Sequence, residues 1–466
     1  MGGFFGVAAR DDCVTDLFFG TDYHFHLGTR RGGLAVLHDG GVTRFIKDIS
    51  NAQFRSKMQA DLPRLRGRVG IGVISDTDDQ PVLFRSHLGL FAISTVGVIR
   101  NAEALAARVL AGRTGHFTEM RGGTINPTEL VATILNQEAT FEDGIRRVLQ
   151  EVEGSCSLLV ATPRGLYAAR DRFGRTPVTI GAKDGARAAT VETSALPNLG
   201  FRVARYLGPG EVAFLTAEGD ETRVPPGDKL HICSFLWVYY GYPASSYEGI
   251  NVETVRYRCG ERLAARDDVA VDTVAGIPDS GVGHAIGYAA ARGIPYRRPF
   301  VKYTPTWPRS FMPPNQSLRD LVARMKLIPI EELIRERRLL FCEDSIVRGT
   351  QLQDTIRYLF ELGAREVHMR PACPPLVYAC PYLNFSRSRS EMDLAARRAI
   401  RELEGRADAD LAPFTDPDSD GFAAMVERIR VGLRLTTLRY QRLGDLVAAI
   451  GLPKDKLCTF CWDGVG

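Results

Sequence analysis

One octet of the chain combines residue types that could bind both a phosphate group and a metal ion. The octet, residues 343–350 (EDSIVRGT), follows the apolar run 339–342 and precedes a segment with helical periodicity at 351–362. The apolar run predicts a buried strand, and Gly363 predicts the end of the helix. A loop between a strand and a helix places backbone N–H groups at the helix start, where they bind anions.

The hydroxyl and carboxylate side chains of this octet suit two different kinds of ligand. The hydroxyls of Ser345 and Thr350 could join the backbone N–H groups around a phosphate, and Gly349 would let the backbone approach it closely. The carboxylates of Glu343 and Asp344 could bind ribose hydroxyls or a hydrated Mg²⁺ ion. The alternative is an ordinary acidic strand end that leads into a helix cap.

A second candidate site lies near the C-terminus, where Cys458 and Cys461 form the motif Cys-Thr-Phe-Cys. This motif alone fits a zinc site, a redox pair or no function at all. The nine cysteines of the chain are an odd number scattered over its length, which favours a reducing compartment over a disulfide scaffold. Five of the others are expected to be core residues: Cys13, Cys156, Cys259, Cys342 and Cys373.

Two halves with different sequence patterns must position these sites. Up to about residue 228, short strands alternate with glycine turns, and a hairpin is predicted at 155–170. From about residue 250, strand, glycine loop and helix alternate, which predicts a parallel sheet with ligands at the carboxyl ends of its strands. The stretch around 405–420 is rich in Asp, Ala and Pro, and predicts a surface insertion at about 403–430.

The composition is that of an ordinary globular protein, with 45% hydrophobic and 24% charged residues among 466. The net charge is only +4 and has no long like-charge blocks, so broad binding to nucleic acids or anionic membranes is not expected. No apolar run approaches the ~18 residues that span a bilayer. Because the first residues also lack the pattern of a secretory signal, we expect a cytoplasmic protein without membrane or nucleic-acid partners.

The octet resembles the phosphoribosyl pyrophosphate (PRPP) signature of type I phosphoribosyltransferases, and most closely that of the glutamine PRPP amidotransferase family. That family usually has two aspartates where this chain has Glu343 and Asp344, so the charge is kept. Residues 277–281 (IPDSG) are similar to the family's pyrophosphate loop. Three further segments are similar: 170–181 (RDRFGRTPVTIG), 325–327 (MKL) and 363–370 (GAREVHMR).

The resemblance extends over most of the chain and implies its fold, which mixes α+β and α/β. Residues 1–228 would form a class II glutamine amidotransferase-like domain, an N-terminal-nucleophile (Ntn) hydrolase-like αββα sandwich with a degenerate site. Residues 229–466 would form a type I phosphoribosyltransferase domain with a parallel sheet and an iron–sulfur-binding tail. A homo-oligomer is also expected.

The resemblance also assigns roles around PRPP. Mg²⁺ would be held by Ser280, Glu343 and Asp344, and catalysis would be mainly electrostatic stabilisation of the departing pyrophosphate. Glu343, Asp344, Lys302 and Arg309 are the expected catalytic residues. The residues expected to bind PRPP are Asp279, Ser280, Gly281, Arg324, Lys326, Ser345, Ile346, Val347, Arg348, Gly349 and Thr350. The four basic residues at 302, 309, 324 and 326 could equally be simple surface charges.

The C-terminal stretch 443–464 (LGDLVAAIGLPKDKLCTFCWDG) is similar to the tail of family members that hold a [4Fe–4S] cluster. In those members four cysteines bind the cluster, and the resemblance places the other two ligands at Cys233 and Cys380. The cluster would pin the tail to the catalytic domain. A tetrahedral zinc ion or four unrelated buried thiols are the alternatives.

Five positions of the N-terminal half differ from those that carry glutaminase chemistry in the family. The family's nucleophile is an N-terminal cysteine exposed by Met removal, but Gly2 stands at that position. The oxyanion-hole asparagine is replaced by Val96, and the clamps on glutamine are replaced by Leu27, Val73 and Pro127. Losing one oxyanion donor alone costs roughly 10²–10³ in rate, so the resemblance predicts no glutaminase activity.

We therefore predict Mg²⁺-dependent transfer of phosphoribosyl from PRPP to a nitrogen nucleophile, with release of pyrophosphate. The nucleophile would be free ammonia, ammonia from a partner glutaminase, or another amine. The segment 302–309 (KYTPTWPR) is longer by one residue than the family's flexible loop and has two prolines, which favours an acceptor larger than ammonia. The alternative is a non-catalytic paralogue that binds PRPP or nucleotides and regulates or assembles with an active amidotransferase.

Overall fold

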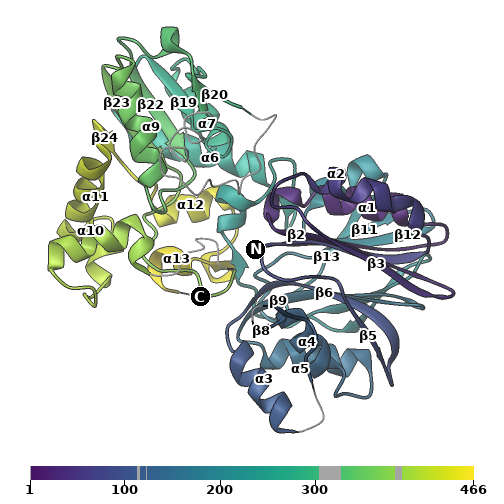
Figure 1. The fold of residues 1–466 in the computed structure, drawn as a ribbon. Helices are drawn as coiled ribbons and strands as arrows, with labels where there is room; N and C mark the ends of the chain where they lie inside the picture. The colour runs from purple at the N-terminus through teal and green to yellow at the C-terminus, as the bar shows by residue number, and fades with distance from the viewer. Residues whose placement is uncertain (1, 113–115, 122, 304–326, 384–390, 466) are drawn as a thin grey trace.

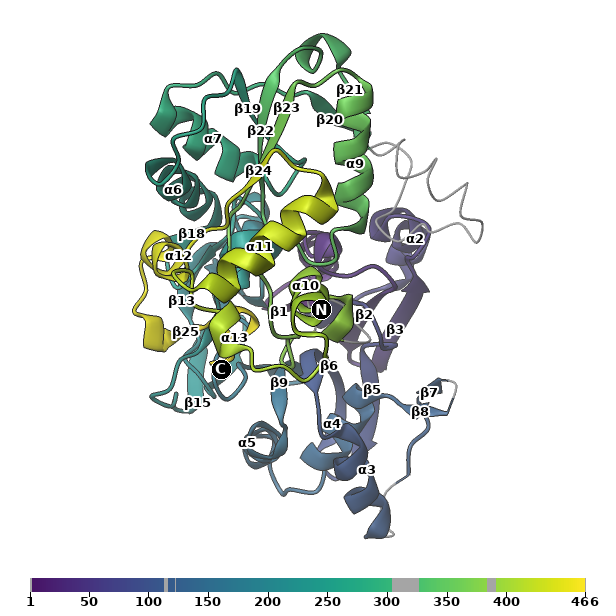
Figure 2. The same cartoon turned by 90° about the vertical axis from the view of Figure 1, so that its left-hand side faces the viewer.

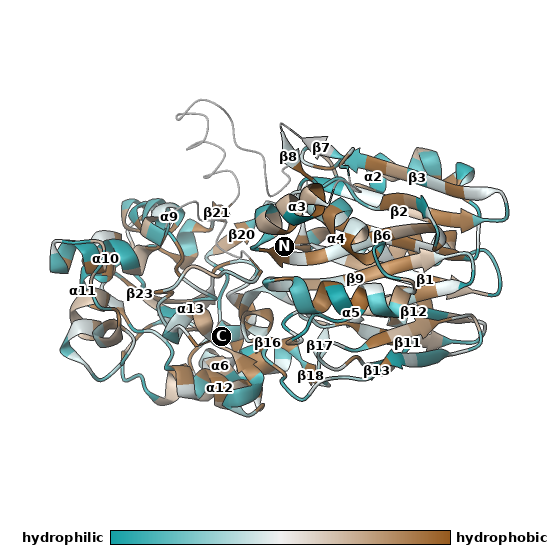
Figure 3. Ribbon diagram, turned by 90° about the horizontal axis from the view of Figure 1, so that it is seen from below, coloured by the Kyte–Doolittle hydropathy of each residue, from teal (hydrophilic) through white to brown (hydrophobic). Residues whose placement is uncertain are grey.

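The computed structural model of the chain describes residues 2–112, 116–121, 123–303, 327–383 and 391–465. The N-terminal half forms one body, on the right of Figure 1, and the C-terminal half forms a second body on the left. The N-terminal end of the first strand, β1 (Gly3–Ala9), lies where the two bodies meet (Figures 1 and 3). No helix among the described residues is both long enough and apolar enough to cross a membrane.

The N-terminal half contains two stacked antiparallel sheets. The first, in pairing order, consists of β13 (Arg202–Tyr206), β11 (Thr179–Lys183), β12 (Ala186–Thr190), β1 (Gly3–Ala9), β4 (Val69–Ser75), β2 (Arg31–His38) and β3 (Gly41–Asp48). The second consists of β15 (Asp220–Val224), β14 (Val212–Leu215), β10 (Gly165–Ala169), β9 (Gly154–Thr162), β6 (Gly89–Ile99) and β5 (Val82–Ser86).

Helices cover the outer face of each sheet, which makes the half an αββα sandwich. The first sheet packs on α1 (Val14–Asp22) and α2 (Phe54–Met58), and the second on α3 (Ala102–Ala111), α4 (Pro127–Leu135) and α5 (Phe141–Glu151). Strands β6 and β9 of the second sheet carry mostly apolar residues (Figure 3). The predicted hairpin is confirmed as β9 and β10, and a small additional hairpin joins β7 (Met120–Arg121) to β8 (Thr124–Ile125).

The C-terminal half contains the predicted parallel sheet, in the order β19 (Thr273–Gly276), β22 (Arg338–Glu343), β23 (Glu366–Pro371) and β24 (Thr437–Leu438). Side chains alternate between its two faces, because successive strand residues point in opposite directions. In β22, Leu340 and Cys342 pack with one helical layer, and Leu339 and Phe341 pack with the other. Both faces are therefore buried, as is usual for a parallel sheet.

The first layer contains α6 (Val252–Ala265), α7 (Val282–Arg292) and α12 (Leu443–Ile450). The second contains α9 (Thr350–Glu361), α10 (Ala395–Glu404) and α11 (Asp420–Leu433). Helices α10 and α11 lie at the end of this half that is remote from the N-terminal half (Figures 1 and 2). The predicted insertion at 403–430 includes part of α11, which buries Met425 and Ile429; the exposed part is the connection between α10 and α11.

Short strand pairs and one short helix complete this half. The pairs are β16 (Ile232–Cys233) with β25 (Leu457–Cys458), β17 (Ser246–Tyr247) with β18 (Ile250–Asn251), and β20 (Phe300–Lys302) with β21 (Leu327–Pro329). Helix α13 (Phe460–Asp463) ends the described chain.

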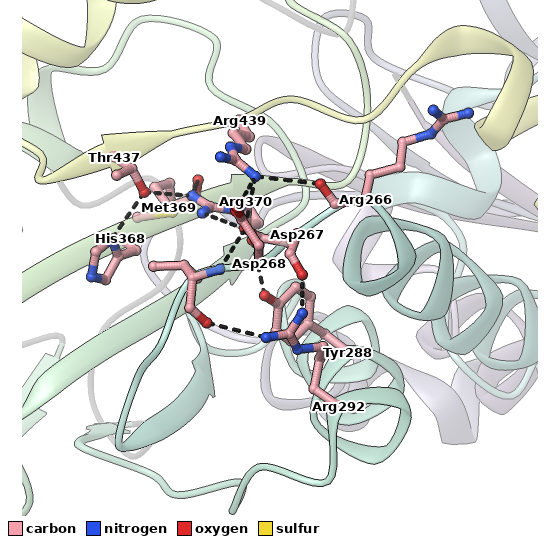
Figure 4. Close-up of polar contacts among 11 residues, drawn as sticks. Arg266, Asp267, Asp268, Tyr288, Arg292, His368, Met369, Arg370, Thr437 and Arg439 are labelled. Atoms are coloured by element: carbon pink, nitrogen blue, oxygen red, sulfur yellow. Dashed lines mark hydrogen bonds and ion pairs between the residues drawn. The ribbon is translucent and has the colours of Figure 1, made fainter.

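A buried ion pair fixes the sheet against its helices (Figure 4). Arg370 at the end of β23 donates to both carboxylate oxygens of Asp267, which follows α6, and both side chains are 1% exposed. Asp267 also accepts from the Tyr288 hydroxyl at 2.9 Å and from Arg439 at 3.1 Å. Because removing one partner of such a pair leaves a buried charge, we expect this network to be important for stability.

Candidate functional site

The octet lies where the sequence predicts it, between the carboxyl end of β22 and the start of α9. Gly349 precedes the helix and has a φ of 76°, in the left-handed region of backbone conformation that residues other than glycine rarely adopt. Among the described residues, the N-cap of α9, Gly349, makes no side-chain capping bond, and the first N–H groups of a helix have no partner within the helix, which suits an anion. Gly349 was expected to permit close approach of a phosphate; the structure adds a conformational reason for glycine at this position.

The two acidic residues of the octet occupy different environments. Asp344 is only 5% exposed, and its Oδ1 accepts a hydrogen bond from the Ser345 hydroxyl at 2.6 Å. Glu343 Oε1 accepts from the backbone N–H of Asp344 at 3.1 Å. Burial and the adjacent Asp344 carboxylate raise the pKa of Glu343 well above its usual range. A bound cation would reverse this effect, because positive charge favours an ionised carboxylate.

The second predicted loop, 277–281, connects β19 to α7 beside the octet. Its backbone is held against β22, since the Ile277 N–H donates to the Cys342 carbonyl at 3.0 Å. A Cβ added to Gly281 would lie 2.3 Å from the same carbonyl oxygen, so only glycine fits there. The Ser280 hydroxyl reaches Glu343 Oε1 at 3.5 Å. The structure thus brings together three residues that the sequence predicts as metal ligands.

Lys302 extends the candidate site from β20. Its ammonium group forms an ion pair with Asp279 of the loop 277–281, and both side chains are largely exposed. Arg309, Arg324 and Lys326, together with most of the predicted lid, lie outside the described residues.

The octet also contacts the start of α10, which was not predicted from the sequence. The Ala395 N–H, at the start of α10, donates to the Val347 carbonyl at 2.7 Å. Arg348 forms an ion pair with Asp393 at 3.5 Å, and Arg398 donates to the Arg348 carbonyl. These contacts join segments about fifty residues apart, and no motif or periodicity in the sequence signals them.

The four predicted cluster ligands also lie together. Cys233 of β16 and Cys458 of β25 are partners in a parallel strand pair, and Cys461 follows in α13. One small cavity is lined by Arg175, Cys233, Phe235, Cys380, Tyr382, Leu383, Cys458, Cys461 and Trp462. Within the described part of the chain, no three His, Cys, Asp or Glu side chains form a group arranged to hold a metal ion.

The thiols of this cavity influence one another. Burial raises the pKa of Cys233 well above its usual range, and the nearby thiols of Cys458 and Cys380 add to the shift. A hydrogen bond with Cys380 and burial raise the pKa of Cys461 in the same way. None of the nine cysteines, all within described residues, forms a disulfide, and the five predicted core cysteines are buried as expected.

The positions of the predicted lost glutaminase site are apolar and packed. Leu27, Val73 and Val96 are each at most 3% exposed and belong to the core between the two sheets. A Cβ added to Gly2 would lie 2.3 Å from the Ile74 carbonyl oxygen. Pro127 begins α4, in the first helical position, where its missing N–H costs nothing.

Comparisons with known proteins agree with this fold. A family model described as a glutamine amidotransferase domain matches residues 66–198. The amidophosphoribosyltransferase of Mycobacterium bovis is 32% identical over 99% of this chain and 85% of its own length. That of Bacillus subtilis is 29% identical over 88% of this chain and 87% of its own length.

Solved structures give the same result. The B. subtilis glutamine PRPP amidotransferase complexed with ADP and GMP matches with a TM-score of 0.85 at 27% identity, covering 99% of this chain and 96% of that one. The fold is therefore an Ntn-type glutaminase domain joined to a phosphoribosyltransferase domain. The chain belongs to the amidophosphoribosyltransferase family, whose members are pentosyl-transferring enzymes.

Proposed function

We propose that this protein transfers phosphoribosyl from PRPP to a nitrogen nucleophile in a Mg²⁺-dependent reaction that releases pyrophosphate, without a glutaminase activity of its own. The main support for this proposal is the contact between the two loops that follow β19 and β22, in which the Ser280 hydroxyl lies next to the Glu343 carboxylate. Ligands bind at this edge of parallel sheets. Family membership supports PRPP as the phosphoribosyl donor.

The side chains at this edge fit a magnesium site. Mg²⁺ prefers oxygen ligands and usually keeps several waters, and Glu343, Asp344 and Ser280 offer two carboxylates and a hydroxyl. When bound with PRPP, Mg²⁺ would stabilise the negative charge of the departing pyrophosphate. The half-buried position of Glu343 beside the Asp344 carboxylate supports this assignment, because a nearby cation would relieve the repulsion between them.

The chain's own groups bind and orient the substrate. The N–H groups of Ser345 to Thr350 at the start of α9 would hold the 5′-phosphate, and Asp344 would orient the ribose hydroxyls. Lys302 and Asp279, paired at the loop 277–281, would contact the pyrophosphate end. Such fixed dipoles and charges act chiefly on the transition state, where charge separates.

The loss of glutaminase chemistry is supported by packing as well as by residue type. Leu27, Val73 and Val96 fill one continuous apolar core, so polar clamps at these positions would each need a buried partner. At the head of β1, Gly2 leaves too little room for a side chain next to Ile74. Ammonia would then come from solution or from a partner glutaminase, or a different amine would be the acceptor.

A [4Fe–4S] cluster on Cys233, Cys380, Cys458 and Cys461 is the cofactor that we propose for the thiol cavity. Four thiolates are the ligand set that such a cluster takes. The shared cavity supports this arrangement. The cluster would tie β16 and the tail to the transferase domain. We also propose that the protein is cytoplasmic and forms a homo-oligomer.

The second candidate function is a non-catalytic paralogue that regulates or partners an active amidotransferase. The changed glutaminase positions of the N-terminal half favour it. The residues of both loops at the carboxyl ends of β19 and β22, where PRPP is proposed to bind, argue against it. Calorimetric titration of the full chain with PRPP, with and without Mg²⁺, tests the proposed site. Mg²⁺-dependent binding at or below millimolar PRPP is expected; its absence would refute the transferase proposal.

A further inference from the structure

Arg175 reaches from the N-terminal half into the thiol cavity of the C-terminal half. It lies between β10 and β11 and is only 4% exposed. Its backbone carbonyl accepts the Cys233 N–H at 3.2 Å, while the carbonyl of Phe173 accepts the His231 N–H at 2.7 Å. The segment around Arg175 therefore runs beside the strand that carries one of the proposed cluster ligands.

The guanidinium of Arg175 packs against two aromatic rings beside the thiol cavity. It lies 3.7 Å from the ring centre of Tyr382 and 4.7 Å from that of Phe173. It lines the thiol cavity together with Cys233, Cys380, Cys458 and Cys461. Its Nε has no hydrogen-bond partner among the described residues.

A buried guanidinium needs a compensating negative charge, because removing a charge from water is energetically costly. Among the described residues, no carboxylate forms an ion pair with Arg175. The thiol cavity can supply the missing charge, since four thiolates around an iron–sulfur core leave the site negative. The cation and the cavity are thus complementary.

We propose that Arg175 is a positioning residue of the cysteine site, whose guanidinium donates to the Cys458 thiolate and balances the negative charge of a bound cluster. This inference rests on the proposed [4Fe–4S] cluster. It gives the N-terminal half a role that is independent of glutaminase chemistry, because one wall of the site comes from it. Hydrogen bonds and charges next to cluster sulfurs set the reduction potential and the stability of ligation.

The test uses the full chain reconstituted anaerobically with ferrous iron and sulfide. Arg175→Met removes the charge and keeps most of the side-chain volume, and Arg175→Lys keeps the charge but removes the planar set of donors. Arg172→Met is the matched control, because Arg172 is exposed and contacts the same Phe173 ring at 5.3 Å without lining the cavity. The readouts are iron per chain, the reduction potential and the rate of iron loss to a chelator.

We expect Arg175→Met to shift the potential to more negative values and to lose iron about tenfold faster than wild type. Arg175→Lys should keep a potential closer to wild type, and Arg172→Met should match wild type in all readouts. If Arg175→Met takes up no iron but Arg175→Lys does, the result supports a role for the positive charge. If both variants fold but neither takes up iron, Arg175 has a packing role and the inference is overturned.

Two further results separate this inference from the cluster itself. A wild-type chain that takes up no iron refutes the cluster and, with it, the role of Arg175. A loaded wild type whose potential and iron loss are matched by Arg175→Met leaves the cluster standing and overturns only the role of Arg175.

Discussion

Ser280 and Glu343 come from the ends of two neighbouring parallel strands and meet with a hydroxyl-to-carboxylate distance of 3.5 Å. They are 63 positions apart in the sequence, and only the side-by-side pairing of β19 and β22 brings them together. A cation held between these loops would touch groups from both, so the sheet itself sets the geometry of the proposed Mg²⁺–PRPP site.

Asp344→Asn should lower turnover of PRPP by about 10²-fold, a few kcal/mol of transition-state stabilisation, because it keeps the shape but removes a charge next to the metal and ribose. Initial rates of pyrophosphate release measure this loss. Asp354→Asn, an equal change of charge on the exposed face of α9, is the control and should leave the rate unchanged. Equal rates for Asp344→Asn and wild type would remove Asp344 from the site.

Gly349→Val should abolish PRPP binding, because a β-branched residue cannot adopt a φ of 76° without distorting the start of α9. Calorimetry measures binding directly. Gly293→Val provides the control: Gly293 also has a positive φ, 64°, but lies at the far end of α7 with open space around it. Both variants should lose about 1–2 kcal/mol of stability, and only Gly349→Val should lose binding.

Iron analysis tests the thiol cavity. Anaerobically purified protein should be brown and contain about four iron and four sulfide per chain. Cys380→Ser should lose most of this content, whereas Cys156→Ala, remote in the core of the N-terminal half, should retain it. Zinc in place of iron after anaerobic purification would refute the cluster and leave the four-cysteine site intact.

Gly2→Cys should not create a glutaminase. The added side chain would press against the Ile74 carbonyl, and the apolar residues at 27, 73 and 96 offer no groups to hold glutamine. Release of glutamate from glutamine, measured against a reaction without protein, is the assay. Activity in this variant above that background would show that the clamps are dispensable.

The parts of the fold that depend on local patterns could be predicted from the sequence. The alternation of strand, glycine loop and helix predicts the parallel sheet, and both phosphate-site loops lie at its carboxyl edge. The contact of α10 with Val347 and Arg348 could not be predicted, because it depends on how distant segments pack. The same holds for the position of Arg175, because only the folded structure shows residues from the two halves lining one cavity.

Pyrophosphate release from PRPP with Mg²⁺, compared in parallel for glutamine, ammonium salts and a panel of small amines, tests whether the protein is a phosphoribosyltransferase that lacks glutaminase activity. We predict release with ammonium or with one of the amines, no stimulation by glutamine, and no release without Mg²⁺. Release that depends on glutamine and is accompanied by glutamate would contradict the loss of the glutaminase. No Mg²⁺-dependent release with any acceptor would contradict the assignment as a phosphoribosyltransferase and leave the non-catalytic paralogue as the better account.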